Sequence, residues 1–332
     1  MTKHIAETGG RIMAGMAALV AALAIAAPAR AQSDYPNRPV HLIVPYGAGG
    51  VADVGMRILA EKLGPVLKQQ VIVENRPGAG GIIAAKAGAT AAPDGYTLSM
   101  TGNNYAISAA LFNSLPYNIL TDFRSISTTS FFDLLILTKS GSPLKTVQDL
   151  VKAAKANPGK LNIGTINPGS TRNLAAELFK SETGINVTIV PFRTSPDMAT
   201  ALLRGDITIA FEFYAAAHGL IDDKKVTVLA STGPKRTSYL PDVPTVIESG
   251  IKDFNVASWN GISVPTATPT AIVDKLNKAF NEVLKMPDVQ AKANKFGMEM
   301  LGSTPAEMDA RTKADIAKWA SVIKAAGIQK RN

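Results

Sequence analysis

Apolar runs of strand length alternate with helical stretches along most of the chain. In a first series, short apolar runs bounded by turn residues are typical of buried strands, and a stretch with helical spacing follows each of the first two. The predicted elements are strands at 41–46 (HLIVPY), 70–74 (QVIVE) and 96–100 (YTLSM), and helices from about 52 to 67 and from about 81 onward. Repeated strand–helix units of this kind predict a parallel sheet that is covered by helices.

A second series of the same kind begins near residue 161. Its predicted elements are strands at 161–165 (LNIGT), 187–192 (VTIVPF), 207–212 (ITIAFE) and 226–230 (VTVLA), and helices that begin near 169 and cover about 196–204. Because the pattern occurs twice, the sequence predicts two α/β domains, each with a sheet between helices.

Two long stretches, 123–141 and 254–265, are extended in character and are predicted to cross between the domains. The chain after these crossings is helical. Thr268 and Thr304 each precede a proline, which is typical of an N-cap followed by proline at the first helical position. We expect these C-terminal helices to pack onto the first domain.

The resulting prediction is a molecule of two lobes joined by two crossings, with a cleft between them. Lobe 1 is predicted to consist of residues 32–132 and 257–332, and lobe 2 of residues 133–256. Such an arrangement supports hinge closure around a ligand.

The first 31 residues have the parts of a secretory signal peptide. Arg11 closes a weakly basic start, residues 12–27 are apolar throughout, and Ala29 and Ala31 frame an A-x-A cleavage site. The alternative is a membrane anchor, but the apolar run is shorter than the ~20 residues that a span needs, and a cleavage site follows it. Cleavage after Ala31 predicts a periplasmic protein that is not embedded in the membrane.

Composition narrows the classes of function. The chain has no Cys, so neither a lipid anchor on cysteine nor a disulfide is expected. Its net charge of +9 is spread along the sequence, and no basic run interleaves with aromatic residues, which argues against nucleic-acid binding. We expect a monomer with a mild attraction for anionic ligands.

A glycine loop joins the first predicted strand to the first helix. Residues 42–53 read LIVPYGAGGVAD and match the G-x-G-x-x-G/A dinucleotide pattern, with Glu74 at the end of the next strand. Pro45 and Tyr46, however, separate the strand from the glycines, and export of an unfolded chain would leave it where nicotinamide cofactors are scarce. The alternatives are a plain turn, or a helix N-terminus that binds some other anion, such as a carboxylate. We expect no cofactor.

A second stretch repeats this arrangement of a strand, a glycine-containing turn and a helix. Residues 164–177 (GTINPGSTRNLAAE) predict a strand, a Pro-Gly turn and a helix that Ser170 or Thr171 could cap. Two helix N-termini on opposite lobes could grip one anion across the cleft. The similar stretch at 75–81 (NRPGAGG) has no acid, base or nucleophile beside it and is interpreted as a structural turn.

Catalytic constellations are missing from the sequence. Beyond the signal peptide the only histidines are His41 and His218, and no Cys can help them to bind a metal. No G-x-S-x-G nucleophile elbow occurs. The sequence therefore indicates a binding protein and not an enzyme, with no metal site.

An ordered set of motifs resembles one known family. The motifs are YPNRPVHLIVPYGAGGVAD, VIVENRPGAGG, AAPDGYTL, LPYNILTDFRSIS, LNIGT, VPF, LLRGDI, LPDVPTVIESG and GISVP. Together they resemble the substrate-binding proteins of tripartite tricarboxylate transporters, the Bug-type receptors, over essentially the whole chain after the signal peptide. The resemblance implies a periplasmic type II binding-protein fold with two lobes, which captures a small organic carboxylate and delivers it to a membrane transporter.

The resemblance also implies a set of ligand contacts. One carboxylate is expected on the first loop, and further contacts on the opposite lobe, on the loop 101–105 and on the turn after VPF. The implied residues are Tyr46, Gly47, Ala48, Gly49, Gly50, Asp53, Asn103, Asn104, Thr165, Gly169, Ser170 and Arg193.

Departures from the family pattern leave the substrate open. Tyr46 stands where phenylalanine is usual, and the two asparagines suggest a polar distal group on the ligand. Arg193 or Arg172 could pair with a second carboxylate, or either could be a solvated surface charge. An alternative role is that of a periplasmic sensor, which presents a bound acid to a signalling receptor.

Overall fold

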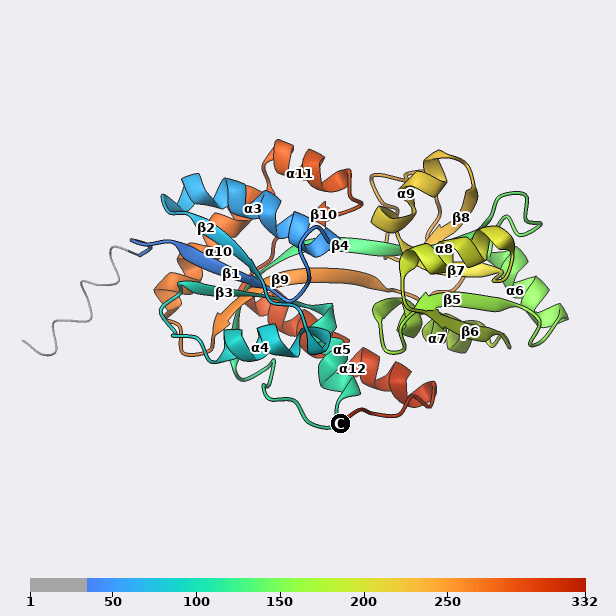
Figure 1. Cartoon of the computed structure of the whole chain (residues 1–332), viewed down its shortest axis with the longest axis horizontal. Helices are drawn as coiled ribbons and strands as arrows, with labels where there is room; N and C mark the ends of the chain where they lie inside the picture. The colour runs from blue at the N-terminus through green and yellow to red at the C-terminus, as the bar shows by residue number, and fades with distance from the viewer. Residues whose placement is uncertain (1–34) are drawn as a thin grey trace, which may run out of the picture.

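The computed structural model of the protein describes residues 35–332. The predicted signal peptide lies outside the described residues. Two lobes lie side by side along the long axis of the molecule, each built on a sheet with helices around it, and two long strands run between them (Figure 1). The predicted α/β class with two lobes is confirmed.

The first half of the chain contains the first predicted series. Its elements are β1 (Val40–Val44), α3 (Val51–Leu67), β2 (Val71–Asn75), the 3₁₀ helix η1 (Ala79–Gly81), α4 (Ile82–Ala89), β3 (Thr97–Gly102), α5 (Asn103–Leu111) and the crossing strand β4 (Phe123–Lys139). All three predicted strands and both predicted helices are present. The loop expected at 101–105 is wrong, because β3 runs directly into α5.

The second half contains the second series and the C-terminal helices. Its elements are α6 (Val147–Ala156), β5 (Asn162–Ile166), α7 (Thr171–Thr183), β6 (Thr188–Phe192), α8 (Ser195–Arg204), β7 (Ile209–Phe213), α9 (Tyr214–Asp222), β8 (Val226–Ser231), β9 (Ala257–Pro265), α10 (Thr270–Leu284), α11 (Pro287–Asn294), β10 (Glu299–Met300) and α12 (Pro305–Ala325). The four predicted strands are present here as well.

Three strands of each series pair in parallel, as the strand–helix pattern predicts, whereas β8 of the second series pairs antiparallel with β4. β1 lies between β2 and β3, and β5 lies between β6 and β7. The crossing strand β4 is shared: its first part pairs antiparallel with β9, and its second part, from Leu134 onward, pairs antiparallel with β7 and β8. Because the carboxyl ends of parallel strands meet at one edge of a sheet, the loops after β1 and β3 lie together.

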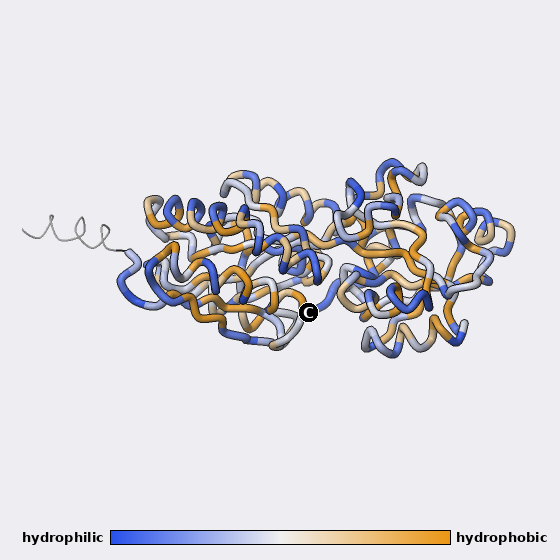
Figure 2. Tube along the Cα trace, turned by 90° about the horizontal axis from the view of Figure 1, so that it is seen from above, coloured by the Kyte–Doolittle hydropathy of each residue, from blue (hydrophilic) through white to orange (hydrophobic). Residues whose placement is uncertain are grey.

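Each lobe has an apolar core between its sheet and its helices. In the first lobe, strand residues such as Leu42 and Met100 are fully buried against Leu59 of α3 and Phe280 of α10. Figure 2 shows apolar residues concentrated along the strands, while the outer helices alternate between apolar and polar positions, as expected for helices with one buried face.

The C-terminal helices differ in part from the prediction. α10 and α11 contact α3 in the first lobe, as expected. α12 contacts α5 but also α7, and its residue Trp319 belongs to the same buried cluster as Phe179 of α7. At 1.5 Å per residue α12 is about 30 Å long, so it extends from one lobe to the other.

Only one of the two predicted N-caps is present. Thr304 caps α12, with its hydroxyl accepting from the Glu307 N–H and the Glu307 carboxylate accepting from the Thr304 N–H. The prediction for Thr268 is wrong, because α10 begins at Thr270 with Pro269 in the cap position. Thr268 instead lies in a turn that its own N–H closes onto Pro265.

Candidate functional site

The first glycine loop connects β1 to α3. Gly49 has φ +82°, a left-handed conformation that favours glycine, and Gly50 is the N-cap of α3. Since Gly50 has no side chain to accept from the first helical turn, α3 has no side-chain N-cap within the part of the chain that the structure describes. Tyr46, Gly47, Ala48 and Gly50 line a large cavity together with the first residues of the helix.

Asp53 does not line this cavity. Its buried carboxylate accepts hydrogen bonds from the Gly49 N–H (2.8 Å), the Arg57 Nε (2.9 Å) and the Asn75 Nδ2 (2.8 Å). Burial acts to raise the pKa of Asp53, but the hydrogen bonds from Arg57, Gly49 and Asn75 outweigh it and hold the pKa below 3.8. Asp53 is thus an ionised support beneath the loop, and the Gly49 N–H is directed to it.

The second predicted loop connects β5 to α7 in the other lobe. Gly169 (φ +78°) and Asn167 (φ +25°) allow the chain to reverse, and the Gly169 N–H donates to the Asn173 Oδ1 (2.9 Å). Ser170, one of the two residues predicted as possible caps, is the N-cap of α7 and accepts from the Asn173 N–H (3.2 Å). Gly169 and Ser170 line the same cavity as the first loop. Thr165 is fully buried below them, and its hydroxyl has no hydrogen-bond partner among the described residues.

The two asparagines at the start of α5 have different environments. Asn103 is buried, accepts from the Trp319 Nε1 (2.7 Å) and donates to the Thr171 Oγ1 (3.0 Å). It therefore links the first lobe to the N-terminus of α7. Asn104 lines the cavity, and its buried Nδ2 has no partner among residues 35–332.

The stretch 75–81 does more than turn the chain. Gly78, Gly80 and Gly81 have positive φ values, and residues 77–82 form part of the cavity wall where α4 begins. The stretch leads into α4, as its interpretation as a structural turn predicts, and it also borders the cavity. The similarity of this stretch to the first glycine loop was the feature of the sequence that could have predicted its place in the cavity wall.

The cavity has a volume of about 1210 Å³ and includes residues of both lobes. That exceeds the usual ~300–1,000 Å³ of a small-molecule site. The N-termini of α3, α4, α5 and α7 all contribute lining residues. None of the described lining residues is Asp or Glu.

The two arginines singled out in the sequence lie in unlike places. Arg172 lines the cavity, but its Nε donates to the Glu212 Oε1 (2.5 Å) and its guanidinium lies 4.4 Å from the centre of the Phe213 ring. Arg193 is exposed and is not among the lining residues. Sequence reasoning missed Arg331, which lines the cavity from the C-terminal segment; no motif marks it.

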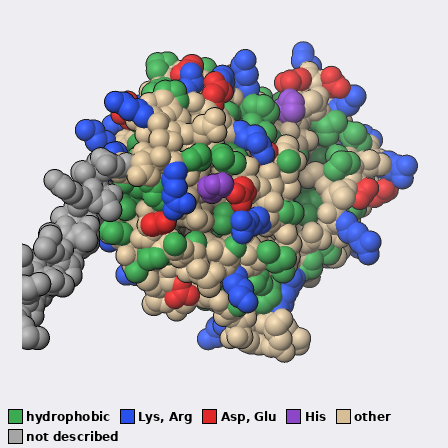
Figure 3. Space-filling view, turned by 60° about the vertical axis from the view of Figure 1, so that its left-hand side comes forward, with side chains coloured by type: hydrophobic (Ala, Val, Ile, Leu, Met, Phe, Trp, Pro, Cys, Tyr) green, Lys and Arg blue, Asp and Glu red, His purple; other side chains and the backbone are tan. Residues whose placement is uncertain are grey.

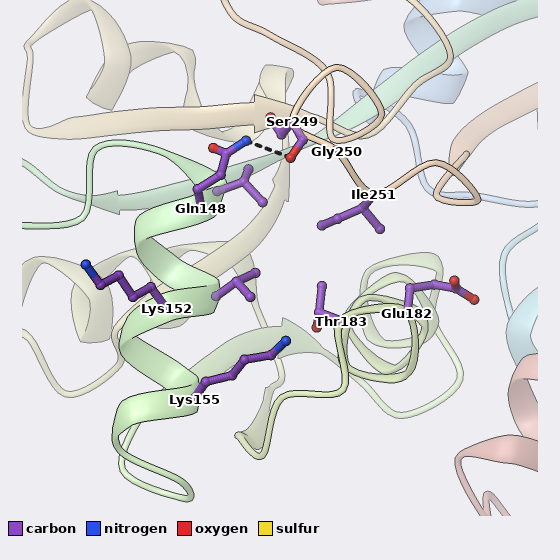
Figure 4. A pocket seen from close by; sticks show the side chains of 10 residues that line it. Gln148, Lys152, Lys155, Glu182, Thr183, Ser249, Gly250 and Ile251 are labelled. Atoms are coloured by element: carbon purple, nitrogen blue, oxygen red, sulfur yellow. Dashed lines mark hydrogen bonds between the residues drawn. The ribbon is translucent and has the colours of Figure 1, made fainter.

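A smaller cavity of about 540 Å³ lies between α6, the end of α7 and residues 249–251 (Figure 4). Gln148 donates to the Ser249 carbonyl across it (2.6 Å), and Lys152 and Lys155 stand at its edge. No lining residue here has a buried polar side-chain atom without a partner among the described residues. It therefore offers less for ligand recognition than the interlobe cavity.

Other classes of site find little support between residues 35 and 332. No group of three or more His, Asp or Glu side chains in this range could hold a metal ion. None of the helices in the same range combines the length and apolar composition that crossing a bilayer requires. On the face shown in Figure 3, lysines and arginines are spread among other residue types and form no single basic patch.

Comparison with known proteins gives one coherent result. The family model described as tripartite tricarboxylate transporter family receptor (TctC) matches residues 55–328. Protein BugT of Bordetella pertussis is 32% identical over 319 residues, which cover 96% of this chain and 98% of that protein.

Two solved structures are similar as well. The structure of R. palustris Rpa4515 with adipate has a TM-score of 0.77 at 32% identity, covering 90% of this chain and 100% of that chain. MatC (Rpa3494) from Rhodopseudomonas palustris with bound malate has a TM-score of 0.70 at 28% identity, covering 87% and 100%. These likenesses confirm the predicted two-lobed binding-protein fold.

Proposed function

We propose, because this chain belongs to the tripartite tricarboxylate transporter family of receptors, that it captures a small organic carboxylate in the interlobe cavity and delivers it to a membrane transporter of that type. The family is one of solute-binding receptors and not of enzymes. The proposal extends to a periplasmic location, reached through a signal peptide at residues 1–31.

The observation that carries the proposal is the convergence of four helix N-termini on one cavity. α3, α4, α5 and α7 each contribute residues from their first turn to its lining, and no acidic side chain stands among the described lining residues. The N-terminus of a helix behaves as roughly half a positive charge, and its free N–H groups point along the axis. Such an arrangement favours an anion that can accept several hydrogen bonds at once, as a carboxylate can.

The comparisons point to the same ligand chemistry. Adipate and malate, named with the two similar structures, are both small organic acids. We propose that one carboxylate of the ligand lies against Gly47, Ala48 and Gly50 and reaches the 169–170 turn of the other lobe. The Asn104 Nδ2, which has no partner among the described residues, is an additional donor at this wall.

Closure of the lobes is part of the proposal. We propose lobe boundaries at 132/133 and 256/257, supported by the change of partners along β4 between Asp133 and Leu134 and by the start of β9 at Ala257. Bending at these two places would bring the helix N-termini of both lobes onto one ligand. The closed form would be the one that the transporter recognises.

Thermal unfolding against a panel of small carboxylates tests the proposal. A ligand at 100 times its dissociation constant stabilises the folded state by about 2.7 kcal/mol, which shifts the midpoint by several degrees. We expect such a shift with one class of acids and none with NAD. A shift with NAD and with no acid would contradict the proposal.

The variant Gly47→Val locates the binding site. A Cβ at Gly47 would meet no heavy atom within 4 Å, and its φ is not in the left-handed region, so the unliganded protein should be unstrained. The side chain would nevertheless stand where the ligand must approach the backbone, so the acid-dependent shift should vanish. Gly219→Val is the matched control, because Gly219 also has open space around it and does not line the cavity. A shift that survives in Gly47→Val would refute the loop assignment.

A further inference from the structure

The interlobe cavity has two arginines among its described lining residues, and only one of them is paired with a carboxylate of the protein. Arg172 is paired with Glu212, and the two side chains are only 18% and 5% exposed. The Arg172 guanidinium is also stacked on Phe213. Its positive charge is therefore compensated inside the protein, and a ligand would have to compete with a buried carboxylate for it.

Arg331 is attached to the first lobe by its backbone. Its N–H donates to the Leu111 carbonyl (2.9 Å), and its own carbonyl accepts from the Asn113 N–H (2.8 Å). These bonds pair the C-terminal segment with Phe112, directly after α5. The position of Arg331 at the cavity is thus fixed by main-chain hydrogen bonds and does not depend on its side chain.

The Arg331 side chain reaches the opposite lobe. Its Nη2 donates to the Pro168 carbonyl (2.8 Å), in the turn that leads to α7. This acceptor is neutral, and among residues 35–332 no carboxylate lies within salt-bridge distance of Arg331. A guanidinium has five N–H donors, and one such bond leaves most of them free.

We infer that Arg331 is the residue that binds the second carboxylate of a dicarboxylate ligand in this cavity. This inference rests on the proposed function, in which the first carboxylate lies at the helix N-termini. A planar guanidinium matches a carboxylate in bidentate geometry, so it selects acids with a second anionic group over acids with one. The sequence suggested that Arg193 or Arg172 could pair with a second carboxylate. We assign that role to Arg331, because Arg193 does not line the cavity and Arg172 is already paired with Glu212.

The bound diacid would join three parts of the molecule. Its second carboxylate would meet a guanidinium that is anchored beside Leu111 on the first lobe and bonded to Pro168 on the second. Arg331 is thus a specificity-determining residue at the point where the lobes approach each other.

The experiment compares diacids with monoacids of equal carbon number: adipate with hexanoate, glutarate with pentanoate, and succinate with butyrate. Dissociation constants are measured by calorimetric titration for the unmodified protein and for Arg331→Gln. Lys330→Gln is the matched control, because it removes the same charge from the neighbouring residue, which does not line the cavity. The readout is the diacid preference, which is the ratio of the monoacid to the diacid dissociation constant.

The unmodified protein should prefer at least one diacid over its monoacid by roughly tenfold, as expected for a charge-assisted bidentate pair. Arg331→Gln should reduce that preference to about one, and Lys330→Gln should leave it in place. If Arg331 only holds the Pro168 turn, its loss weakens diacid and monoacid binding equally and the preference survives, which would overturn the inference.

Failure of the inference can be told from failure of the proposed function. Binding of monoacids as tightly as diacids would overturn the diacid inference while leaving the carboxylate receptor in place. Failure of both series to bind, in a protein that also responds to no other carboxylate, would count against the proposed function, and the inference would fall with it.

Discussion

The substitution Asp53→Asn tests how the first glycine loop is held in shape. The Asp53 side chain is only 2% exposed and accepts from three donors: the Gly49 N–H, the Arg57 Nε and the Asn75 Nδ2. Asparagine has nearly the same volume, but it has one acceptor oxygen in place of two and no charge. At least one donor would then face an amide NH₂ group.

The structure sets the magnitude of this effect. A hydrogen bond to a charged group contributes about 1.5–3 kcal/mol, and a buried donor left without a partner costs a similar amount. Because the Arg57 side chain is 50% exposed, part of its interaction is screened by water. We therefore expect Asp53→Asn to lower the free energy of unfolding by about 2–3 kcal/mol. Acid binding should weaken as well, since the Gly49 N–H and the loop beside it lose their support.

The pH dependence of this effect has a definite sign. The pKa of Asp53 in the folded protein lies below its ordinary value of 3.8, because the three hydrogen bonds outweigh the effect of burial. The stabilisation is therefore complete above about pH 4 and is lost as the pH falls through the lowered pKa. The difference between the variant and the unmodified protein should shrink in acid.

Urea unfolding followed at several pH values is the assay. Asp223→Asn is the control, because Asp223 pairs with Lys225 at the surface, where both side chains are more than half exposed, and should change stability little. Equal stability of Asp53→Asn and the unmodified protein at neutral pH would refute this account of the loop.

Two further predictions concern stability away from the cavity. Thr304→Ala removes the hydroxyl that accepts from the Glu307 N–H, while the Thr304 N–H can still donate to the Glu307 carboxylate, and the substitution should cost about 1 kcal/mol in chemical unfolding; a change below a few tenths would contradict the cap assignment. Burial and the nearby Glu299 carboxylate raise the pKa of Asp133 to about 7, so the stability of the unmodified protein should fall as the pH rises from about 4 to 7. In Asp133→Asn this slope should be smaller, and an unchanged slope would show that Asp133 is not its source.

Most of the fold could be predicted from the sequence because the signals were local. Each parallel strand is a short apolar run with a helix after it, so periodicity and turn residues placed the elements to within a few residues. The N-cap at Thr304 followed from the Thr-Pro pair. The same pair at Thr268 misled, because α10 begins one residue later with Pro269 in the cap position, and the Thr268 hydroxyl has no hydrogen-bond partner among the described residues.

The candidate site was less predictable, because side-chain partners far apart in sequence decide its details. Asp53 and Asn103 were expected to face the ligand. The Asp53 side chain instead forms hydrogen bonds with Arg57 and Asn75. The Asn103 side chain forms hydrogen bonds with Trp319 and Thr171. Arg331 is more than 150 residues from the turn that it contacts, and nothing in its own segment marks it as part of a site.

The most direct test of the central claim compares an acid with its neutral analogue. For the acid that gives the largest thermal shift, calorimetric titration should be carried out with the acid and with the corresponding amide, in which the carboxylates become uncharged CONH₂ groups. If helix N-termini bind the carboxylate, the acid should bind at one site per chain and the amide should bind at least tenfold more weakly. Equal affinity for the acid and the amide would contradict the account.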